Sequence, residues 1–92
     1  MSEDWSWRLV GKAKDDYRAL DPPARTRLAD KLDEVIENPW RDPSDWAESL
    51  TGGPYDRLRV GDWRCAVSFD HEELTMTVHR IKQRRDAYKA DD

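Results

Sequence analysis

The sequence predicts an α+β domain in which two helices cover one face of a small, antiparallel-dominated sheet. Residues 5–10 alternate in polarity as a strand does, and residues 28–36 carry an apolar stripe at helical spacing. Residues 55–81 then contain three more strand-like runs separated by turn residues. A strand, two helices and three strands in this order predict one layer of helices packed on one sheet. The 92 residues are expected to form a single domain, 1–92.

The first strand and the short helix after it supply part of the predicted core. Strand alternation puts Trp5, Trp7 and Leu9 on one face. A short helix is expected over residues 13–20, where apolar residues recur at intervals of four and three. Trp63, further along the chain, is predicted to join the two N-terminal tryptophans in the core.

The second helix has the clearest pattern in the chain. Its apolar stripe falls at i, i+4, i+7 and i+8 and consists of Leu28, Leu32, Val35 and Ile36. Asp21 can cap its start, and Pro22 suits its first turn, where no intrahelical N–H is needed. Asn38 followed by Pro39 predicts its end, because the residue before a proline disfavours the helical conformation.

Three strands are predicted in the second half of the chain. Residues 40–48 are expected to form a loop with one helical turn around Trp46. A strand over 55–60 is followed by a turn at Gly61 and Asp62, and then by strands over 63–69 and 74–81. The segment between these last two strands reads as a hairpin turn with solvated acidic side chains.

The first of these three strands separates apolar from basic side chains. Alternation puts Leu58 and Val60 on one face, and Arg57 and Arg59 on the other. Arginines from the neighbouring elements can converge on the same face. Clustered guanidinium groups beside an aromatic ring suit a phosphodiester and its base better than they suit a core.

The distribution of charge matters more than its total. The formal net charge is −4, which argues against a simple nucleic-acid binder. Residues 1–54 carry eight basic and twelve acidic side chains, whereas residues 79–89 carry five basic and one acidic. A basic surface near the C-terminus is therefore available. Eleven arginines against five lysines, and fourteen aspartates against six glutamates, are typical of adaptation to high salt, as in a halophile, or of GC-rich coding.

Several classes of protein are disfavoured by the sequence. The single Cys65 cannot form an internal disulfide, which favours a reducing cytoplasm. Neither Cys65 nor His71 and His79 show metal-ligand spacing, so no metal and no cofactor are expected. The chain shows no signal peptide and no apolar run long enough to cross a bilayer. We therefore expect a cytoplasmic protein without a membrane partner.

Two motifs resemble those of the RelE/ParE superfamily of type II toxins. Leu50-x-Gly52 followed by Tyr55-x-Arg57-Leu58-Arg59-Val60-Gly61-Asp62-Trp63-Arg64 is similar to the L-x-G … y-R-l-R-v-G-d-y-R signature of that family. Ile81-Lys82-Gln83-Arg84-Arg85-Asp86-Ala87-Tyr88 is similar to its closing I-x-h-R-x-x-x-Y motif. The helical first half matches more loosely, so the resemblance covers essentially the whole chain.

The resemblance implies the toxin of a toxin–antitoxin system, a small endoribonuclease (an mRNA interferase) that inhibits translation by cutting messenger RNA on the ribosome. RelE members need no metal, because the 2′-hydroxyl of the RNA is the nucleophile. By motif position the implied catalytic residues are Arg57, Arg59, Arg64, Arg84 and Tyr88. The implied RNA-binding residues are Arg80, Lys82 and Arg85. The implied partners are a cognate antitoxin, mRNA and the ribosome.

Other interpretations of the same residues stay open. Gln83 stands where many members have His or Lys, and an arginine is a poor general base. Arg64 could simply pair with Asp62 or Asp86, and Arg80 could belong to a solvated face. The alternative function is a ParE-like gyrase inhibitor or a catalytically weak module that binds an antitoxin. ParE-type chains have a longer helical hairpin and lack the terminal arginine and tyrosine.

Overall fold

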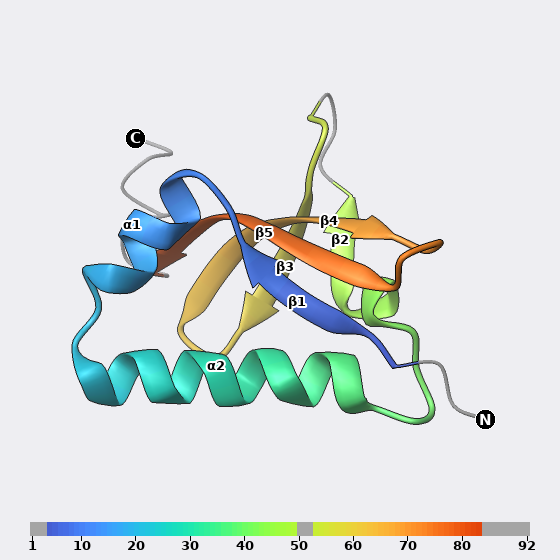
Figure 1. The fold of residues 1–92 in the computed structure, drawn as a ribbon, viewed down its shortest axis with the longest axis horizontal. Coiled ribbons are helices and arrows are strands. Elements are labelled where there is room, and N and C mark those ends of the chain that lie inside the picture. Colours follow the sequence, from blue (N-terminus) through green and yellow to red (C-terminus); the bar gives the residue numbers. More distant parts are fainter. Residues whose placement is uncertain (1–3, 50–52, 84–92) are drawn as a thin grey trace.

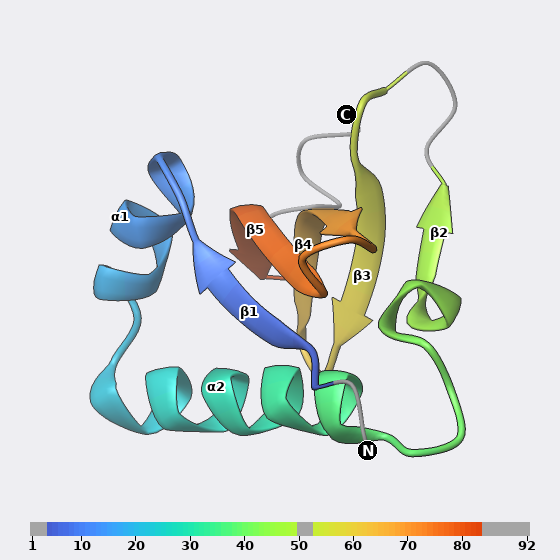
Figure 2. The ribbon, with the colours of Figure 1, turned by 45° about the vertical axis from the view of Figure 1, so that its right-hand side comes forward.

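The computed structural model describes residues 4–49 and 53–83, and Figures 1 and 2 show how its elements are arranged. In chain order the elements are β1 (Ser6–Leu9), α1 (Lys12–Arg18), α2 (Pro22–Glu37), the 3-10 helix η1 (Pro43–Trp46), β2 (Ala47–Ser49), β3 (Asp56–Val60), β4 (Trp63–Asp70) and β5 (Thr75–Gln83). The predicted α+β class is confirmed. The predicted strands and both predicted helices are present, with ends that differ by a few residues.

The described strands form one sheet in the order β1-β5-β4-β3-β2. Strand β1 runs parallel to β5, and the other three pairings among the described strands are antiparallel. The pairing of β1 with β5 joins residues far apart in the chain, such as Ser6 and Thr75. The sheet is thus mixed but mostly antiparallel, as predicted.

The core lies between this sheet and α2, which runs along one face of it (Figures 1 and 2). Leu28 and Leu32 are fully buried and Val35 is 5% exposed, while Ile36 packs half-buried at the edge of the core. The sheet contributes Leu58, Val60, Trp63, Cys65, Val67, Met76, Val78 and Ile81. The stripe predicted from periodicity is therefore the face that α2 buries.

Two N-terminal tryptophans are less buried than predicted. Trp63 is 5% exposed and belongs to the core, but Trp5 and Trp7 are half-buried. They lie on and beside β1, an edge strand with a neighbour on only one side. Trp7 donates a hydrogen bond from Nε1 to Asp33 on α2 at 2.8 Å, and Trp5 packs edge-on against Phe69.

Two further predictions were wrong in detail. The segment before β3 contains the predicted helical turn, η1, but Ala47–Ser49 then pairs with β3 as a fifth strand. A three-residue edge strand is too short to show alternation in the sequence. Asp21 does occupy the N-cap position of α2, but its side chain makes no capping hydrogen bond. Pro22 leaves fewer N–H groups to cap in that first turn.

The hairpin between β3 and β4 follows the sequence prediction. Gly61 adopts φ 58° at the first position of a two-residue connection. A type II′ turn requires a positive φ there, and glycine takes it without a steric penalty. This tight turn fixes the register that places Arg59 opposite Arg64.

Candidate nucleic-acid interface

The face of the sheet opposite α2 carries most of the predicted site residues. Side chains of paired residues on neighbouring strands project from the same face, so the register assigns them to cross-strand rows. Arg59 pairs with Arg64, and Arg64 pairs with Lys82. These three residues, here called the basic row, bring cations from β3, β4 and β5 into one line. Like charges in adjacent cross-strand positions destabilise a sheet, so an anion bound here relieves their repulsion.

A second row lies beside the basic row and contains a carboxylate. It runs Glu48, Arg57, Ala66 and Arg80 across β2 to β5, and we call it the mixed row. Glu48 is within 3.6 Å of Arg57 and 3.1 Å of Arg59, so it touches arginines of both rows. About half of the Glu48 side chain is exposed. Nε of Arg57 is buried without a hydrogen-bond partner among the described residues.

Arg64 lies at the centre of the basic row. Its Nη1 donates a hydrogen bond to the carbonyl oxygen of Trp63 at 3.1 Å. Within the part of the chain that the structure describes, neither Arg64 nor Lys82 forms an ion pair, and Asp62 is no partner of Arg64. Arg64 is half-buried and Lys82 is exposed. Among the described residues, the middle of the basic row thus offers guanidinium and ammonium groups that are not held in an ion pair. Asp86, the other partner considered for Arg64, lies outside the described residues.

Arg80, in contrast, is engaged by α1. Its Nε lies 2.9 Å from Oδ2 of Asp16, and the same carboxylate oxygen accepts the backbone N–H of Ile81 at 2.9 Å. Burial alone raises the pKa of Asp16, but these hydrogen bonds and the charges of Arg80 and Lys82 bring that pKa below its ordinary value. Hydrogen bonding to Asp16 likewise raises the pKa of Arg80. We therefore assign Arg80 a role in fastening α1 to β5.

A third row lies toward the turn between β4 and β5. It contains Ser68, Thr77 and Arg8, and we call it the hydroxyl row. His79 is the extra residue of a bulge in β5 next to this row, and its Nε2 is 2.8 Å from Oγ of Ser68. Tyr55 stacks on the imidazole with ring centroids 4.0 Å apart. Burial and the nearby charge of Arg8 lower the pKa of His79, so it is uncharged at neutral pH.

The predicted site residues fall into three groups. Arg57, Arg59, Arg64 and Lys82 lie together on the helix-free face. Arg80 shares that face but pairs with Asp16. Arg84, Arg85 and Tyr88 lie outside the described residues. Glu48 was missed by the sequence analysis, because the strand that positions it was not predicted.

Cys65 takes no part in this surface. It is 1% exposed on the core face of β4, and burial raises the pKa of its thiol to about 12. It is therefore a packing residue, as predicted. Among the described residues, no group of three His, Cys, Asp or Glu side chains is placed to hold a metal ion.

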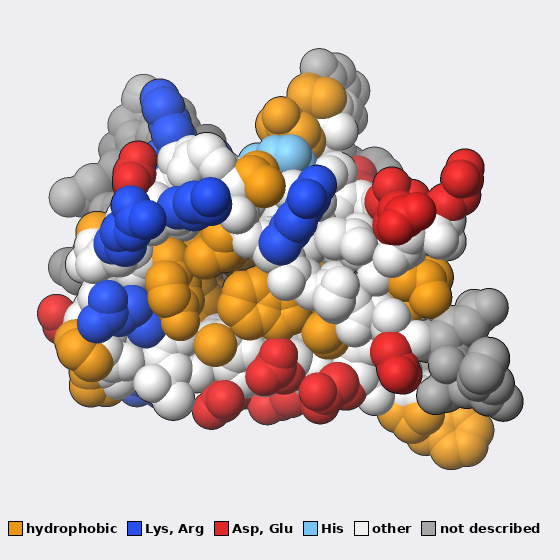
Figure 3. All heavy atoms as spheres, viewed as in Figure 1, with side chains coloured by type: hydrophobic (Ala, Val, Ile, Leu, Met, Phe, Trp, Pro, Cys, Tyr) orange, Lys and Arg blue, Asp and Glu red, His pale blue; other side chains and the backbone are white. Residues whose placement is uncertain are grey.

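Acidic and basic side chains occupy different parts of the surface. In Figure 3 the acidic side chains follow α2 along the lower edge and gather again at the β4–β5 turn, whereas basic side chains lie over α1 and the upper edge of the sheet. The negative net charge is therefore not spread evenly over the surface, and the register gathers three cations in the basic row. Contact of arginines with phosphate at short range remains effective there.

The link between α1 and β5 leads to a pH-dependent prediction. Asp16→Asn should lower the free energy of unfolding at pH 7 by about 1–3 kcal/mol, the scale of hydrogen bonds to a charged group. Because the pKa of Asp16 is lower in the folded protein, its stabilisation is present above the unfolded value of 3.8 and is lost as the pH falls through the folded pKa. Urea unfolding at several pH values measures this. The neighbouring Asp15, which is 76% exposed, gives the control Asp15→Asn. An equal loss in both variants at pH 7 contradicts the assignment.

The fold has close counterparts among solved structures. The RelBE2 toxin–antitoxin complex from Mycobacterium tuberculosis contains a chain that matches with a TM-score of 0.70 and 20% identity, over 89% of this chain and all of that one. A mutant of the Escherichia coli toxin RelE in the free state matches with a TM-score of 0.65 and 18% identity, over 97% and 93% of the two chains. A chain of the archaeal RelE–RelB complex from Pyrococcus horikoshii matches with a TM-score of 0.62 and 17% identity, over 89% of this chain and 97% of that one. The chain has the fold of the RelE toxins.

Sequence comparisons add nothing to this likeness. No protein-family model matches the chain, and no curated protein matches it. In the described parts of the chain, every helix is too short or too polar to cross a membrane.

Proposed function

We propose that this protein is the toxin of a type II toxin–antitoxin system and that it cleaves messenger RNA. The observation that carries the proposal is the basic row, Arg59, Arg64 and Lys82, which lies next to Arg57 and Glu48 on the helix-free face of a RelE fold. Among the described residues, Arg64 and Lys82 form no ion pair, and free cations in a row suit the RNA backbone.

The nucleophile of the proposed reaction is the 2′-hydroxyl of the RNA itself. The 2′-oxygen loses its proton and attacks the adjacent phosphorus, the bond from phosphorus to the 5′-oxygen breaks, and the leaving 5′-oxygen takes up a proton from water. The products carry a 2′,3′-cyclic phosphate and a 5′-hydroxyl. Charge on the phosphate oxygens increases in the transition state. In this proposal Arg64, which donates a hydrogen bond to the carbonyl oxygen of Trp63, stabilises that charge, and Arg57 and Arg59 bind on the 2′-oxygen side. By motif position, Arg84 assists the leaving oxygen and Tyr88 aligns the base.

The proton of the 2′-hydroxyl requires an acceptor, and Glu48 is the best candidate on this face. An arginine does not give up its proton at neutral pH, whereas a carboxylate accepts one. Glu48 contacts both Arg57 and Arg59, so their charges hold it beside the proposed position of the 2′-oxygen. The negative charge of this carboxylate also reduces the repulsion between the two arginines. We assign Glu48 the role of general base.

Glu48→Gln should reduce the rate of single-turnover cleavage by about 10²–10⁴-fold, the usual contribution of a general base. Single-turnover cleavage of a ribosome-bound message measures this effect. Glu34→Gln, on the exposed face of α2, is the matched control. A wild-type rate in Glu48→Gln removes Glu48 from the mechanism.

The product ends test the proposed reaction. Purified protein added to ribosomes with a bound message should yield fragments with a cyclic phosphate, and cleavage should continue in EDTA. EDTA-sensitive cleavage, or products with a 3′-hydroxyl, would overturn the mechanism. Binding of an antitoxin without any cleavage would support the alternative of a catalytically weak module.

The proposed partner is an antitoxin encoded beside the toxin, because the solved RelE structures include complexes with RelB. Expression of the protein alone in its native host should arrest growth, and coexpression of the neighbouring small gene should relieve the arrest. Growth curves and viable counts measure this. A native host that tolerates high levels of the lone protein contradicts the toxin assignment.

A further inference from the structure

A hollow on the helix-free face lies next to the proposed cleavage site. Its volume is about 660 Å³, within the range of pockets that hold small molecules. Its lining includes the hydroxyl row and His79 from the strands, and the acidic β4–β5 turn, whose side chains we call the rim. Ser68 is two residues along β4 from Ala66 of the mixed row, a separation of about 7 Å. A nucleotide beside the cleaved phosphate can therefore reach the hollow.

Both hydrogen-bond donors and acceptors line the hollow. Arg8 is one of the donors, and its Nε donates a hydrogen bond to Oγ1 of Thr77 at 3.3 Å. The carboxylates of Asp70, Glu72 and Glu73 are on the rim. Next to the row, the uncharged His79 and the stacked Tyr55 supply flat rings. The proposed cleavage reaction uses none of these residues.

We propose that this hollow binds an unpaired guanine base of the RNA beside the cleavage point. The inference rests on the proposed function and names the specificity of the same face. Guanine presents the acceptors O6 and N7, which a guanidinium such as that of Arg8 recognises. Its N1–H and N2–H₂ groups are donors, and carboxylates of the rim can accept from them. No other RNA base combines a two-acceptor edge with a two-donor edge.

The charges of the hollow exclude a phosphate as its occupant. Three acidic side chains line the rim against one arginine, so the negative charge of a backbone phosphate would be repelled. The basic row, which has the opposite balance, is the place for the backbone. Base and phosphate are thus separated along the same face, with aromatic rings between them for stacking.

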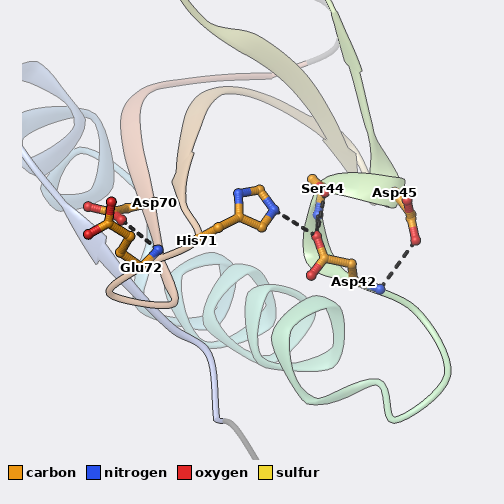
Figure 4. A network of polar contacts seen from close by, with 6 residues as sticks. All are labelled: Asp42, Ser44, Asp45, Asp70, His71 and Glu72. Carbon is orange, nitrogen blue, oxygen red and sulfur yellow. Dashed lines mark hydrogen bonds and ion pairs between the residues drawn. The ribbon is translucent and has the colours of Figure 1, made fainter.

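The acidic rim is held in place before any ligand binds (Figure 4). Oδ1 of Asp70 accepts the backbone N–H groups of Glu72 and Glu73, each at 3.0 Å. His71 reaches across to Asp42, with 3.2 Å between Nε2 and Oδ2. Asp42 in turn accepts a hydrogen bond from the hydroxyl of Ser44, which lowers its pKa. A braced turn loses little conformational entropy when a base binds.

Free nucleosides test the inference without any cleavage. In ¹⁵N NMR titrations of the full chain, guanosine should shift the amide signals of Ser68, Thr77 and Glu72, and should bind about 10-fold more tightly than adenosine, cytidine or uridine. Arg8→Met should weaken guanosine binding by about 10-fold, and Glu72→Gln should reduce the preference for guanosine. Arg18→Met, a change at an exposed position of α1, is the matched control.

The outcomes separate this inference from the proposed function. Equal binding of all four nucleosides, or no shift of the three amide signals with guanosine, overturns the inference even if RNA is cleaved. Guanosine binding that Arg8→Met abolishes, in a protein that does not cleave RNA, supports the pocket and overturns the endoribonuclease. If Arg8→Met unfolds the protein, Glu72→Gln provides the test. Loss of the preference for guanosine in that variant supports the inference, and a retained preference overturns it.

Discussion

Replacing Arg64 with alanine should reduce the single-turnover rate of RNA cleavage by about 10²–10³-fold, the effect of removing one preorganised donor to a developing oxyanion. Arg64 is at the centre of the basic row and is oriented by the carbonyl oxygen of Trp63. The stability of the protein should change by no more than about 0.5 kcal/mol, because the lost hydrogen bond is offset by relief of repulsion from Arg59 and Lys82.

Cleavage of ribosome-bound message and urea unfolding, measured on the same preparation, distinguish a functional from a structural role. Arg18→Ala removes an equal charge from an exposed site on α1 and is the control. A wild-type rate in Arg64→Ala would remove this residue from the site. A rate loss accompanied by equal destabilisation would instead make Arg64 structural.

Leu32→Ala should destabilise the protein by about 2–5 kcal/mol, the range for removing a fully buried leucine. Leu32 is fully buried between α2 and the sheet, among the largest enclosed side chains of the core. A domain of this size has a stability of only about 5–15 kcal/mol, so the variant could lose most of it.

Equilibrium unfolding in urea measures the loss, with circular dichroism as the signal. Lys31→Ala changes the preceding, exposed residue of the same helix and should have little effect. A loss below about 1 kcal/mol in Leu32→Ala would mean that α2 does not form the core as described.

The helices and strands in which apolar residues recur at a regular spacing were predictable from the sequence. Helix α2 buries leucine and valine side chains that recur every three or four residues. In β3, Leu58 and Val60 alternate with arginines. The fifth strand, Ala47–Ser49, was not predictable, because three residues show no period and its pairing with β3 depends on the tertiary structure. The partial exposure of Trp5 depends on sheet order, which no local pattern encodes.

Part of the candidate site was predictable where a strand pattern defines it. Alternation puts Arg57 and Arg59 on one face, and the turn at Gly61 brings Arg59 beside Arg64. The ion pair of Arg80 with Asp16 joins residues 64 positions apart, and nothing in the sequence near either residue indicates it. Glu48 was not predicted as a site residue, because the three-residue strand that positions it shows no sequence pattern. Long-range pairing therefore accounts for what the sequence analysis missed.

The parallel pairing of β1 with β5 sets the time at which this protein can complete its sheet. Arg8 and Thr77, which touch across these strands, are separated by 69 positions, and β5 lies between β1 and β4 in the sheet. Such long-range contacts slow folding because a large loop must close first. During translation the sheet cannot be completed until β5 has left the ribosome. A nascent chain therefore has not assembled the proposed cleavage face while its own ribosome is still reading the message that encodes β5.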